Sequence, residues 1–391
     1  MKRGLMHCWS AAYEDAVREA FVKAGVNLDY FKYPVSDYNN DENVIHAVEN
    51  YFKKYADAGS PCEFVFSVNY IPVLSKVCQR TGVRYISWSV DSPLATIYSK
   101  TITNPCNYFF TFDKVQAEEA ISLGAPHVWH MPLGTGMKEL PKPQEYKADV
   151  SFMGNLYNSD NTDMFSCIHT FPDWLSGYFN GIMQAQLQIY GYNFLSDVIS
   201  EEIWKETKKA VVINNSPEYV DAYKQHFLDM LNRHISRMER KKVLETIGTK
   251  RRIDLYTGSD LSELQAPGIV NRGYADYFED MPVIFNTSKI NLNITSKSII
   301  SGIPLRVFDI MGCGGFVLSN YQPELAELFE DGREVVLYES ISDMEDKIEY
   351  YLAHEEERRE IARRGCEKVQ GRYRFEMRVS EILKAVFGDG E

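Results

Sequence analysis

Residues 290–320 read INLNITSKSIISGIPLRVFDIMGCGGFVLSN, and this run contains the pattern that decides the fold. It predicts a buried strand (INLNIT), then a helix (PLRVFDIMG), then a second buried strand (GFVLSN), separated by polar and glycine-rich turns. A strand, a helix and a strand joined by short turns form a βαβ unit, and such units build parallel sheets. The stretch therefore predicts an α/β fold.

The same alternation of strand and helix patterns fills the first third of the chain. It begins with the strand pattern GLMHCW at residues 4–9 and continues to the strand pattern HVWHMPLG at residues 127–134. The run GMKELPKPQEYKAD (136–149) is rich in Lys and Pro, which is typical of a linker. After it the alternation starts again at DVSFMGN (149–155). The sequence thus predicts two α/β units joined by a linker.

The predicted first domain spans residues 1–147, and the second spans residues 148–371. A mainly helical segment, at about 160–247, lies within the second domain. The last helix pattern, at about 372–391, follows the final element of the second domain and is a candidate to pack back on the first. The chain has 391 residues, which is long enough for two hydrophobic cores.

Composition and charge narrow the classes of partner. A net charge of −13 argues against broad nucleic-acid binding, because such binding needs Lys and Arg to neutralise phosphates. No stretch approaches about 18 uninterrupted apolar residues, and the N-terminus lacks a signal-peptide pattern, so no transmembrane segment is predicted. The seven cysteines include no CxxC pair, which argues against a zinc site or a disulfide framework. We therefore expect a cytoplasmic protein with no metal site.

The helix and turn of the opening stretch carry residues suited to a phosphate-bearing ligand. Arg306 and Asp309 lie three residues apart on the predicted helix, and Gly314 and Gly315 follow in the turn. An arginine can bind phosphate oxygens in a bidentate manner, and an acidic side chain can accept hydrogen bonds from a ribose. Glycines let the backbone approach a diphosphate closely. The same spacing also fits an ion pair between Arg306 and Asp309 on one helix face.

Further candidates follow predicted strands of the second domain. Gly154 and Asn155 occur in GNLY, and Gly273 and Tyr274 occur in NRGY. Ligands of open parallel sheets bind outside the carboxyl ends of the strands, so these loops are predicted to contribute to the same nucleotide site. Tyr274 is a candidate to border a nucleotide base, although an aromatic residue there is as often part of a core.

The run SGIPLRVFDIMGCGGFVLSNYQPELAELFEDGREVVLY (301–338) resembles the donor-binding segment of group 1 glycosyltransferases, in the version found in CgeB-like spore-protein glycosyltransferases. NRGYADYFEDMPVIFNTSKINLNIT (271–295) resembles the preceding stretch of that family. YISWSVDSPL, NPCNYFFTFDK and KADVSFMGNLY resemble its N-terminal domain and domain junction. The resemblance covers nearly the whole chain, more loosely over residues 160–250. It implies a GT-B fold, with two facing Rossmann-like domains that bind the acceptor and the nucleotide-sugar donor respectively.

The resemblance implies metal-independent transfer of a sugar from a nucleotide-sugar, with a UDP-sugar favoured, to a glycan or protein, and it favours retention of configuration. Asp309 matches the second acid of the family's Glu, seven residues, Glu pattern, which contacts the donor's ribose. The first acid falls at Ser301, a candidate donor contact, so that half of the pattern is absent. Asn155 stands where the family has an arginine, and Arg306 is the candidate for the missing positive charge. These departures leave the sugar and the stereochemical outcome open.

Two residues of the first domain are candidates for the acceptor side of such a reaction. Asp91 follows a predicted strand in WSVDSP, and His7 lies at the start of HCWSAA. In an inverting reaction Asp91, or failing it His7, would deprotonate the acceptor hydroxyl; in a retaining reaction Asp91 would orient the acceptor. The alternatives are an aspartate that caps its own turn and a hydrogen-bonded histidine at a strand end.

Two other functions remain open at this point. One is a non-catalytic assembly protein of a spore or envelope layer, and the other is a nucleotide-sugar epimerase of the same fold. The combination of Arg306, Asp309 and the glycines favours a functional donor site over a non-catalytic assembly protein. An epimerase is expected to carry more acidic residues and histidines around the sugar than the sequence offers. The basic run from Arg233 to Arg252 fits a peripheral contact with anionic lipid or, more simply, a solvated helix face.

Overall fold

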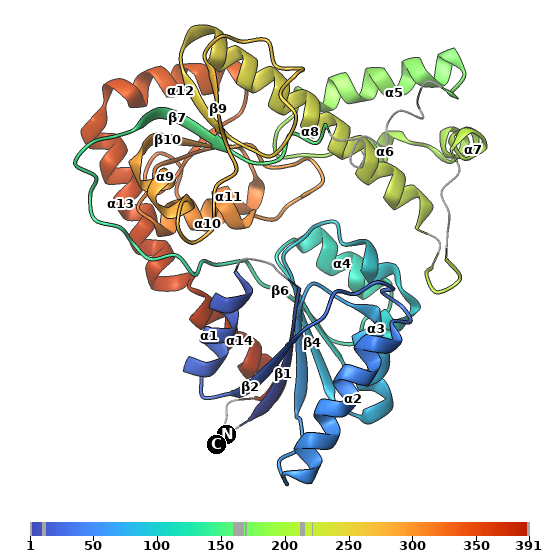
Figure 1. Cartoon of the computed structure of the whole chain (residues 1–391). Helices are drawn as coiled ribbons and strands as arrows, with labels where there is room; N and C mark the ends of the chain where they lie inside the picture. Colours follow the sequence, from blue (N-terminus) through green and yellow to red (C-terminus); the bar gives the residue numbers. More distant parts are fainter. Residues whose placement is uncertain are drawn as a thin grey trace. The chain divides into compact units, whose positions relative to one another are not determined.

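The computed structural model describes residues 2–9, 13–158, 168, 170–211, 216–220 and 222–388 (Figure 1). The chain divides into two compact units. The first comprises Met1–Gly136, Asn215–Ala222 and Arg372–Glu391, and the second comprises Met137–Asn214 and Tyr223–Gly371. Each unit is built on its own six-stranded sheet, and the strand pairs in both sheets are parallel. The prediction of two α/β units is thereby confirmed.

The sheet of the first unit has the strand order β2-β1-β3-β4-β5-β6. Its strands are β1 (Arg3–Cys8), β2 (Asn27–Lys32), β3 (Phe64–Val68), β4 (Arg84–Ser89), β5 (Asn107–Thr111) and β6 (Val128–His130). The order reverses beside β1, so the connections leaving β1 and β3 run to opposite sides of the sheet. A crevice is expected at the carboxyl ends of these two strands.

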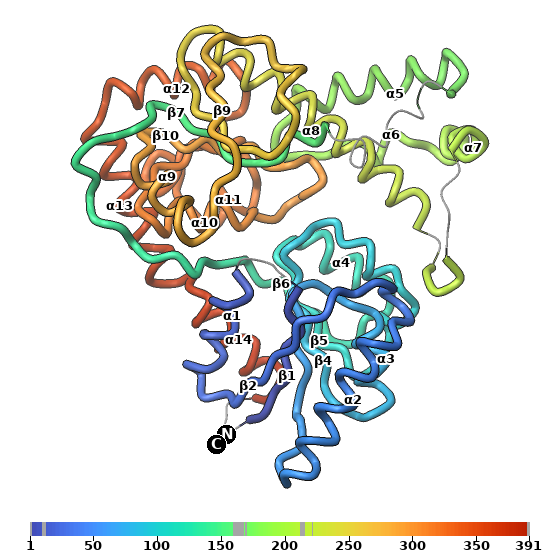
Figure 2. The backbone as a smooth tube through the Cα atoms, in the orientation of Figure 1, coloured from blue at the N-terminus to red at the C-terminus, as the bar shows by residue number. Residues whose placement is uncertain are grey.

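Helices cover this sheet, and the last helix of the chain is among them. They are α1 (Glu14–Lys23), α2 (Glu42–Asp57), α3 (Pro72–Thr81), α4 (Lys114–Ser122) and α14 (Phe375–Phe387), with the short 3-10 helices η1 (Ala95–Tyr98) and η2 (Lys100–Thr103). Figures 1 and 2 show α14 (red) beside α1 (blue). The amide of Phe375 donates to the carbonyl of Thr135 at 3.1 Å, and Lys23 pairs with Glu376 at 2.9 Å.

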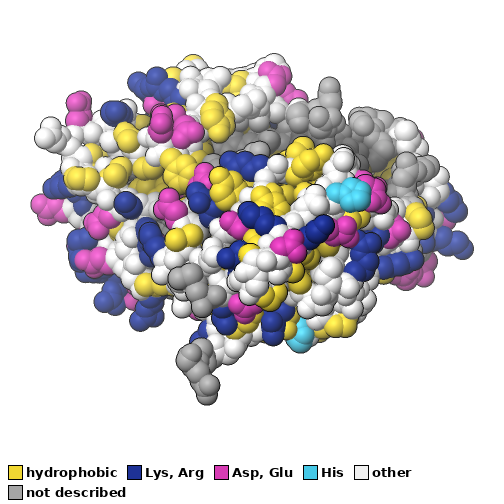
Figure 3. Space-filling view, turned by 60° about the horizontal axis from the view of Figure 1, so that its bottom comes forward, with side chains coloured by type: hydrophobic (Ala, Val, Ile, Leu, Met, Phe, Trp, Pro, Cys, Tyr) yellow, Lys and Arg dark blue, Asp and Glu magenta, His cyan; other side chains and the backbone are white. Residues whose placement is uncertain are grey.

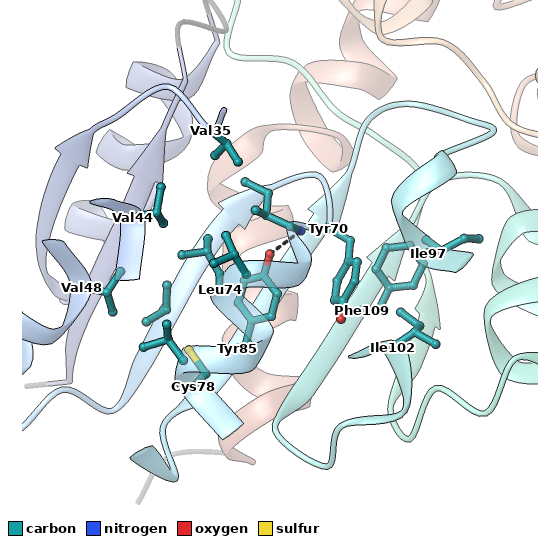
Figure 4. Packing of buried hydrophobic residues seen from close by; sticks show 14 of the residues in the cluster. Val35, Val44, Val48, Tyr70, Leu74, Cys78, Tyr85, Ile97, Ile102 and Phe109 are labelled. Carbon is teal, nitrogen blue, oxygen red and sulfur yellow. Dashed lines mark hydrogen bonds between the residues drawn. The ribbon is translucent and has the colours of Figure 1, made fainter. Parts of the chain in front are cut away.

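A continuous apolar core fixes the central strands of the first unit (Figure 4). Leu74 and Cys78 of α3 pack with Tyr85 of β4 and Phe109 of β5. The buried Tyr85 hydroxyl accepts a hydrogen bond from the amide of Ile71 at 2.8 Å. Buried polar groups need such partners, and this one holds the start of α3 against the sheet.

The sheet of the second unit has the strand order β12-β11-β10-β7-β8-β9. Its strands are β7 (Ala148–Met153), β8 (Ile253–Tyr256), β9 (Ile269–Gly273), β10 (Ser288–Asn293), β11 (Val317–Asn320) and β12 (Val336–Tyr338). In chain order this is the 3-2-1-4-5-6 arrangement of the doubly wound fold, with β7 as its first strand. The strand order therefore reverses between β7 and β10.

The helices of the second unit follow the predicted pattern with one difference. They are α5 (Asp173–Gln186), α6 (Leu195–Val198), α7 (Glu201–Ala210), α8 (Tyr223–Lys250), α9 (Met281–Thr287), α10 (Leu305–Gly312), α11 (Pro323–Leu328), α12 (Ile341–Ala353) and α13 (Glu355–Arg372). The pattern SDMEDKIEYYLAHEEERREIARRGCEKVQ (342–370) predicts a single long helix over α12 and α13, but His354 leaves the helical conformation and separates them. Figure 2 shows α5, α6 and α7 gathered at one end of α8, where they share a small apolar core of their own.

Charged side chains of both signs are interspersed on the face shown in Figure 3, with no wide area of a single sign. No helix within the described ranges is long and apolar enough to cross a membrane. The described residues on this face thus form no broad basic area.

Candidate functional site

The carboxyl ends of β7 and β10 form the switch point of the second sheet, where a ligand is expected in a doubly wound fold. Gly154 and Asn155 follow β7 directly, and Asn293 is the last residue of β10. The two strands are neighbours in the sheet, so these three residues lie at one edge. Arg306, in the first turn of α10, is connected to β10 and reaches the same place.

Arg306 is half-buried, and its guanidinium is held by an amide rather than by an acid. Its Nη1 donates to Oδ1 of Asn293 at 3.2 Å. Within the described part of the chain it forms no ion pair, so the alternative pairing with Asp309 is not observed. The positive charge is therefore left for a ligand.

Arg240, on α8, is a second cation at this switch point, and it is not among the residues predicted from the sequence. Its side chain is only 3% exposed. Its Nη2 donates to the carbonyl of Ile294 at 2.8 Å, its Nη1 donates to the carbonyl of Asn155, and it lies 4.6 Å from the ring centre of Tyr157. These contacts join α8 to the loops that follow β7 and β10. Like Arg306, it has no carboxylate partner among the described residues.

The two guanidiniums influence each other electrostatically. Burial, followed by the repulsion from Arg240, lowers the pKa of Arg306 to about 10. Burial alone would raise the pKa of the Tyr157 hydroxyl, but the charge of Arg240 and other nearby groups outweighs it and lowers that pKa. Two like charges in a partly desolvated place are unfavourable unless an anion joins them. The arginine pair, meaning Arg240 and Arg306, thus suits a diphosphate, whose oxygens accept bidentate hydrogen bonds.

The loop after β7 contacts both residues of the arginine pair. A Cβ atom at Gly154 would lie 3.2 Å from Nη2 of Arg306 and 3.2 Å from the ring of Phe152, so a larger residue would push the guanidinium away. Asn155 uses its side chain within its own loop, where Oδ1 accepts from the amide of Tyr157 at 2.6 Å. Its carbonyl, not its side chain, faces Arg240. Both predicted residues therefore lie at the site. Gly154 leaves space for the Arg306 guanidinium, and the carbonyl of Asn155 orients Arg240.

Asp309 lies one turn after Arg306 and is buried, at 3% exposed. The hydroxyl of Tyr277 donates to its two carboxylate oxygens at 3.0 Å each. This contact joins α10 to the segment that follows β9. Asp309 keeps its place one turn from the arginine pair, but its carboxylate is engaged by a tyrosine in this structure.

The remaining predicted donor residues are spread over three places. Ser301 lies in the loop between β10 and α10, and Gly273, with a φ of +77°, ends β9 before the 80% exposed Tyr274. Gly314 and Gly315 precede β11 and therefore lie at the amino ends of the strands, opposite the arginine pair. A Cβ at Gly315 would come within 3 Å of the carbonyl oxygens of Phe285 and Ile310, so this glycine serves close packing.

A separate cavity of the second unit lies at the amino ends of its strands. Its volume is about 770 Å³, and Ser288, Gly314, Phe316 and the first half of α13 line it. The arginine pair does not line it, so its size does not mark the site that the charges and the strand order indicate.

In the first unit, Asp91 follows β4 and lines a cavity of about 360 Å³ at the carboxyl ends of β1, β3 and β4. The side-chain amide of Asn69 donates to its Oδ2 at 2.7 Å. The carboxylate is exposed and held from a neighbouring strand, not by its own backbone. The alternative of a plain turn-capping aspartate is not what the structure shows.

His7 is buried in β1, at 1% exposed, and its Nε2 lies 2.8 Å from the carbonyl of Tyr33. Its ring packs edge-on against Phe31, with 5.1 Å between ring centres. Burial lowers the pKa of His7, and the hydrogen bond to Tyr33 only partly opposes this effect. The alternative prediction, a hydrogen-bonded histidine at a strand end, describes His7 better than a catalytic role does.

The lowered pKa of His7 predicts a pH dependence of stability. A histidine in the unfolded chain binds a proton at a higher pH than His7 does in the folded chain, so protonation favours unfolding. The contribution of neutral His7 to the free energy of unfolding is therefore complete above the unfolded pKa of about 6.5 and is lost as the pH falls below it. Urea unfolding near pH 7.5 and near pH 5.5 should therefore show a smaller loss of stability in His7→Gln than in the parent protein. Equal losses in the two proteins would contradict the assignment.

Comparisons with known proteins bear on this geometry. Residues 233–384 match the family model described as "Glycosyl transferase-like", a range that includes Arg240 and Arg306. A search of curated protein sequences finds no match to this chain. The CgeB-like subtype therefore rests on the resemblance alone.

Solved structures share the fold over almost the whole chain. The sucrose-phosphate synthase of Thermosynechococcus elongatus is 11% identical with a TM-score of 0.53, covering 99% of each chain. HepE of Anabaena, solved with UDP and glucose, is 10% identical with a TM-score of 0.54, covering 98% of this chain and 100% of its own. The β-glucosyltransferase of phage T4 is 10% identical with a TM-score of 0.53, covering 99% and 100%. The chain has the GT-B fold.

Proposed function

We propose that this chain is a glycosyltransferase that moves a sugar from a nucleotide-sugar donor to an acceptor hydroxyl. The observation that carries the proposal is the arginine pair at the switch point of the second sheet, without a carboxylate partner among the described residues. The family match over residues 233–384 and the GT-B fold support it. Two structures of similar fold were solved with UDP or UDP-glucose, which favours a UDP-sugar as the donor.

The proposed chemistry assigns a role to each part of the site. The bond between the anomeric carbon and the diphosphate breaks, and a bond from the acceptor oxygen to that carbon forms. Arg240 and Arg306 stabilise the negative charge that develops on the departing diphosphate. We favour retention, in which the departing diphosphate takes the acceptor's proton and Asp91 orients the acceptor. In an inverting reaction the proton would pass to Asp91 instead. NMR of the product's anomeric configuration separates the two courses.

We expect the rate of sugar transfer to be independent of metal ions, because Arg240 and Arg306 supply the positive charge that offsets the diphosphate. Transfer measured after dialysis against EDTA should equal transfer in the presence of added magnesium or manganese. A loss of activity in EDTA that is restored by a divalent cation would contradict this part of the proposal.

Nucleotide binding and product analysis test the proposed function directly. A nucleoside diphosphate added at about 100 times its dissociation constant should stabilise the protein by about 2.7 kcal/mol, which raises the melting temperature by roughly 5–10 °C. Mass spectrometry of products from a panel of nucleotide-sugars should show a new glycoside only when an acceptor is present. A product formed from the donor alone would favour an epimerase, and the absence of a shift with every nucleoside diphosphate would contradict a donor site.

A further inference from the structure

We infer that the acceptor of the proposed reaction is a carbohydrate, bound in the cavity of the first unit against Trp9 and Tyr38 with a hydroxyl at Asp91. The inference rests on the proposed function and narrows the acceptor from a glycan or a protein to a glycan. It also assigns Asn69 as the residue that positions the Asp91 carboxylate.

The cavity lies at the switch point of the first sheet. Trp9 follows β1, Asn69 follows β3 and Asp91 follows β4, so three neighbouring strands deliver side chains to one place. The cavity of about 360 Å³ is at the lower end of the roughly 300–1,000 Å³ of small-molecule sites, which suits one or two sugar rings. Its lining includes Trp9, Tyr38, Asn69 and Asp91.

One wall of the cavity is aromatic. Trp9 is 42% exposed, and its ring centre lies 5.7 Å from that of the half-buried Tyr38, with the two planes tilted by 45°. The backbone amide of Trp9 donates to Oε1 of Glu14 at 2.8 Å, which fixes the start of this loop. Aromatic rings offer a large rigid apolar surface, and the tyrosine hydroxyl adds a polar handle. A pyranose ring has the complementary form, an apolar C–H face bordered by hydroxyls.

The other wall is polar and rigidly held by Asn69. Its Oδ1 accepts from the backbone amides of Val90 at 3.0 Å and Asp91 at 3.3 Å, while its Nδ2 donates to Oδ2 of Asp91 at 2.7 Å. Asn69 adopts a left-handed φ of 60°, which is uncommon for a residue other than glycine and concentrates at functional sites. Oδ1 of Asp91 keeps no hydrogen-bond partner among the residues that the structure describes. One carboxylate oxygen is thereby fixed and the other is left for an acceptor hydroxyl.

Tyr38 and Asp91 both line the cavity, so the aromatic and polar walls face the same space. Burial, followed by the charges of Tyr219 and Asp91, raises the pKa of the Tyr38 hydroxyl, so this hydroxyl lies within electrostatic reach of the carboxylate. A ligand resting on the aromatic wall therefore has Asp91 beside it.

A polypeptide acceptor fits this cavity less well. Extended peptides commonly bind by adding to an exposed sheet edge, where unpaired backbone groups are available. β1, β3 and β4 are interior strands whose neighbours occupy both sides. The lining instead offers isolated polar side chains around an aromatic surface, which is the lining expected for a small polar ring compound.

Binding of free sugars to the full chain, without donor, tests the inference. Saturation-transfer NMR with methyl glycosides of glucose, galactose, mannose and N-acetylglucosamine is expected to detect at least one that binds. Trp9→Ala should weaken that binding by at least tenfold and leave UDP affinity unchanged. The matched control is Trp174→Ala, which removes a tryptophan of similar exposure (53%) from α5 of the second unit and should change neither affinity.

Asn69→Gly tests the positioning role, because glycine tolerates the left-handed backbone that Asn69 adopts. We expect kcat for transfer to fall by at least tenfold, with UDP affinity unchanged and the sugar's affinity changed by less than threefold. An unchanged kcat, or a fall in kcat that only matches the loss of folded protein in thermal unfolding, would overturn this role.

The outcomes separate this inference from the proposed function. If UDP binds and the sugar of a UDP-sugar is transferred to peptides or proteins, but no saccharide binds or competes, the inference is wrong and the proposed function stands. If the saccharide signal survives in Trp9→Ala, the placement of the sugar in this cavity is wrong. If no nucleotide binds at all, the proposed function itself has failed.

Discussion

Replacing Arg306 with alanine is expected to lower kcat/KM for sugar transfer by roughly 10²–10³-fold, the loss typical of removing one preorganised group that stabilises charge in a transition state. The guanidinium is held by Asn293 and has no carboxylate partner among the described residues, so its charge is available to the departing diphosphate. Steady-state kinetics with a UDP-sugar would measure the effect. Arg240→Ala should cause a loss of similar size, because Arg240 contributes the second positive charge at the same place.

Matched controls distinguish the site from general effects of removing a cation. Arg233 lies on the same helix as Arg240 but is 40% exposed at its side chain and pairs with Asp229. Arg233→Ala should leave kcat/KM within about twofold of the parent protein, because an exposed ion pair contributes little. Arg240 also holds the carbonyls of Asn155 and Ile294, so thermal unfolding of Arg240→Ala must accompany its kinetics. Near-normal transfer by Arg306→Ala would remove the arginine pair from the mechanism.

The second large effect is expected for Asp91→Asn, which should lower kcat for transfer by about 10²-fold or more and spare the affinity for UDP. The change removes the charged oxygen that faces the acceptor hydroxyl while keeping the shape of the side chain. Losing a group that orients the acceptor or accepts its proton typically costs about this much. Calorimetry with UDP and kinetics with a saccharide acceptor would measure the two quantities separately.

Asp113 supplies a control for this change. It is a buried aspartate of the first unit whose carboxylate caps α4 and accepts from Ser92, next to the same loop but outside the cavity lining. Asp113→Asn should reduce stability more than turnover of the folded protein. If Asp91→Asn lowered UDP affinity as strongly as it lowered kcat, its assignment to the acceptor would be wrong.

The fold could be predicted from the sequence because strand and helix patterns alternate cleanly on both sides of one linker. The βαβ stretch at residues 290–320 forms β10, α10 and β11 as expected. The place of the glycine turn was harder to predict, because Arg306 and Gly314 are close in sequence but lie at opposite ends of α10. α10 carries the chain from the carboxyl end of β10 back to the amino end of β11, and this separates Arg306 from Gly314.

Arg240 was missed because its surroundings are rich in Lys and Arg, which is typical of a solvated helix face. Helical spacing carried a usable signal. Arg240 lies four residues after Ser236 and three before Val243, both of them buried on α8. A charged residue on a buried stripe requires a partner or a ligand. Asn69 carried no comparable signal, because its role depends on a loop from β4 that only the folded sheet brings to it.

The proposed mechanism depends most on binding of a diphosphate by the arginine pair, and the ratio of UDP to UMP affinity measures this binding directly. Isothermal titration should show UDP binding at least tenfold more tightly than UMP to the parent protein, because the second phosphate reaches the two guanidiniums. The ratio should fall towards one in Arg306→Ala and in Arg240→Ala, and it should be unchanged in Arg233→Ala. Equal affinities for UDP and UMP in the parent protein, or a ratio that survives the loss of either Arg240 or Arg306, would contradict the proposed mechanism.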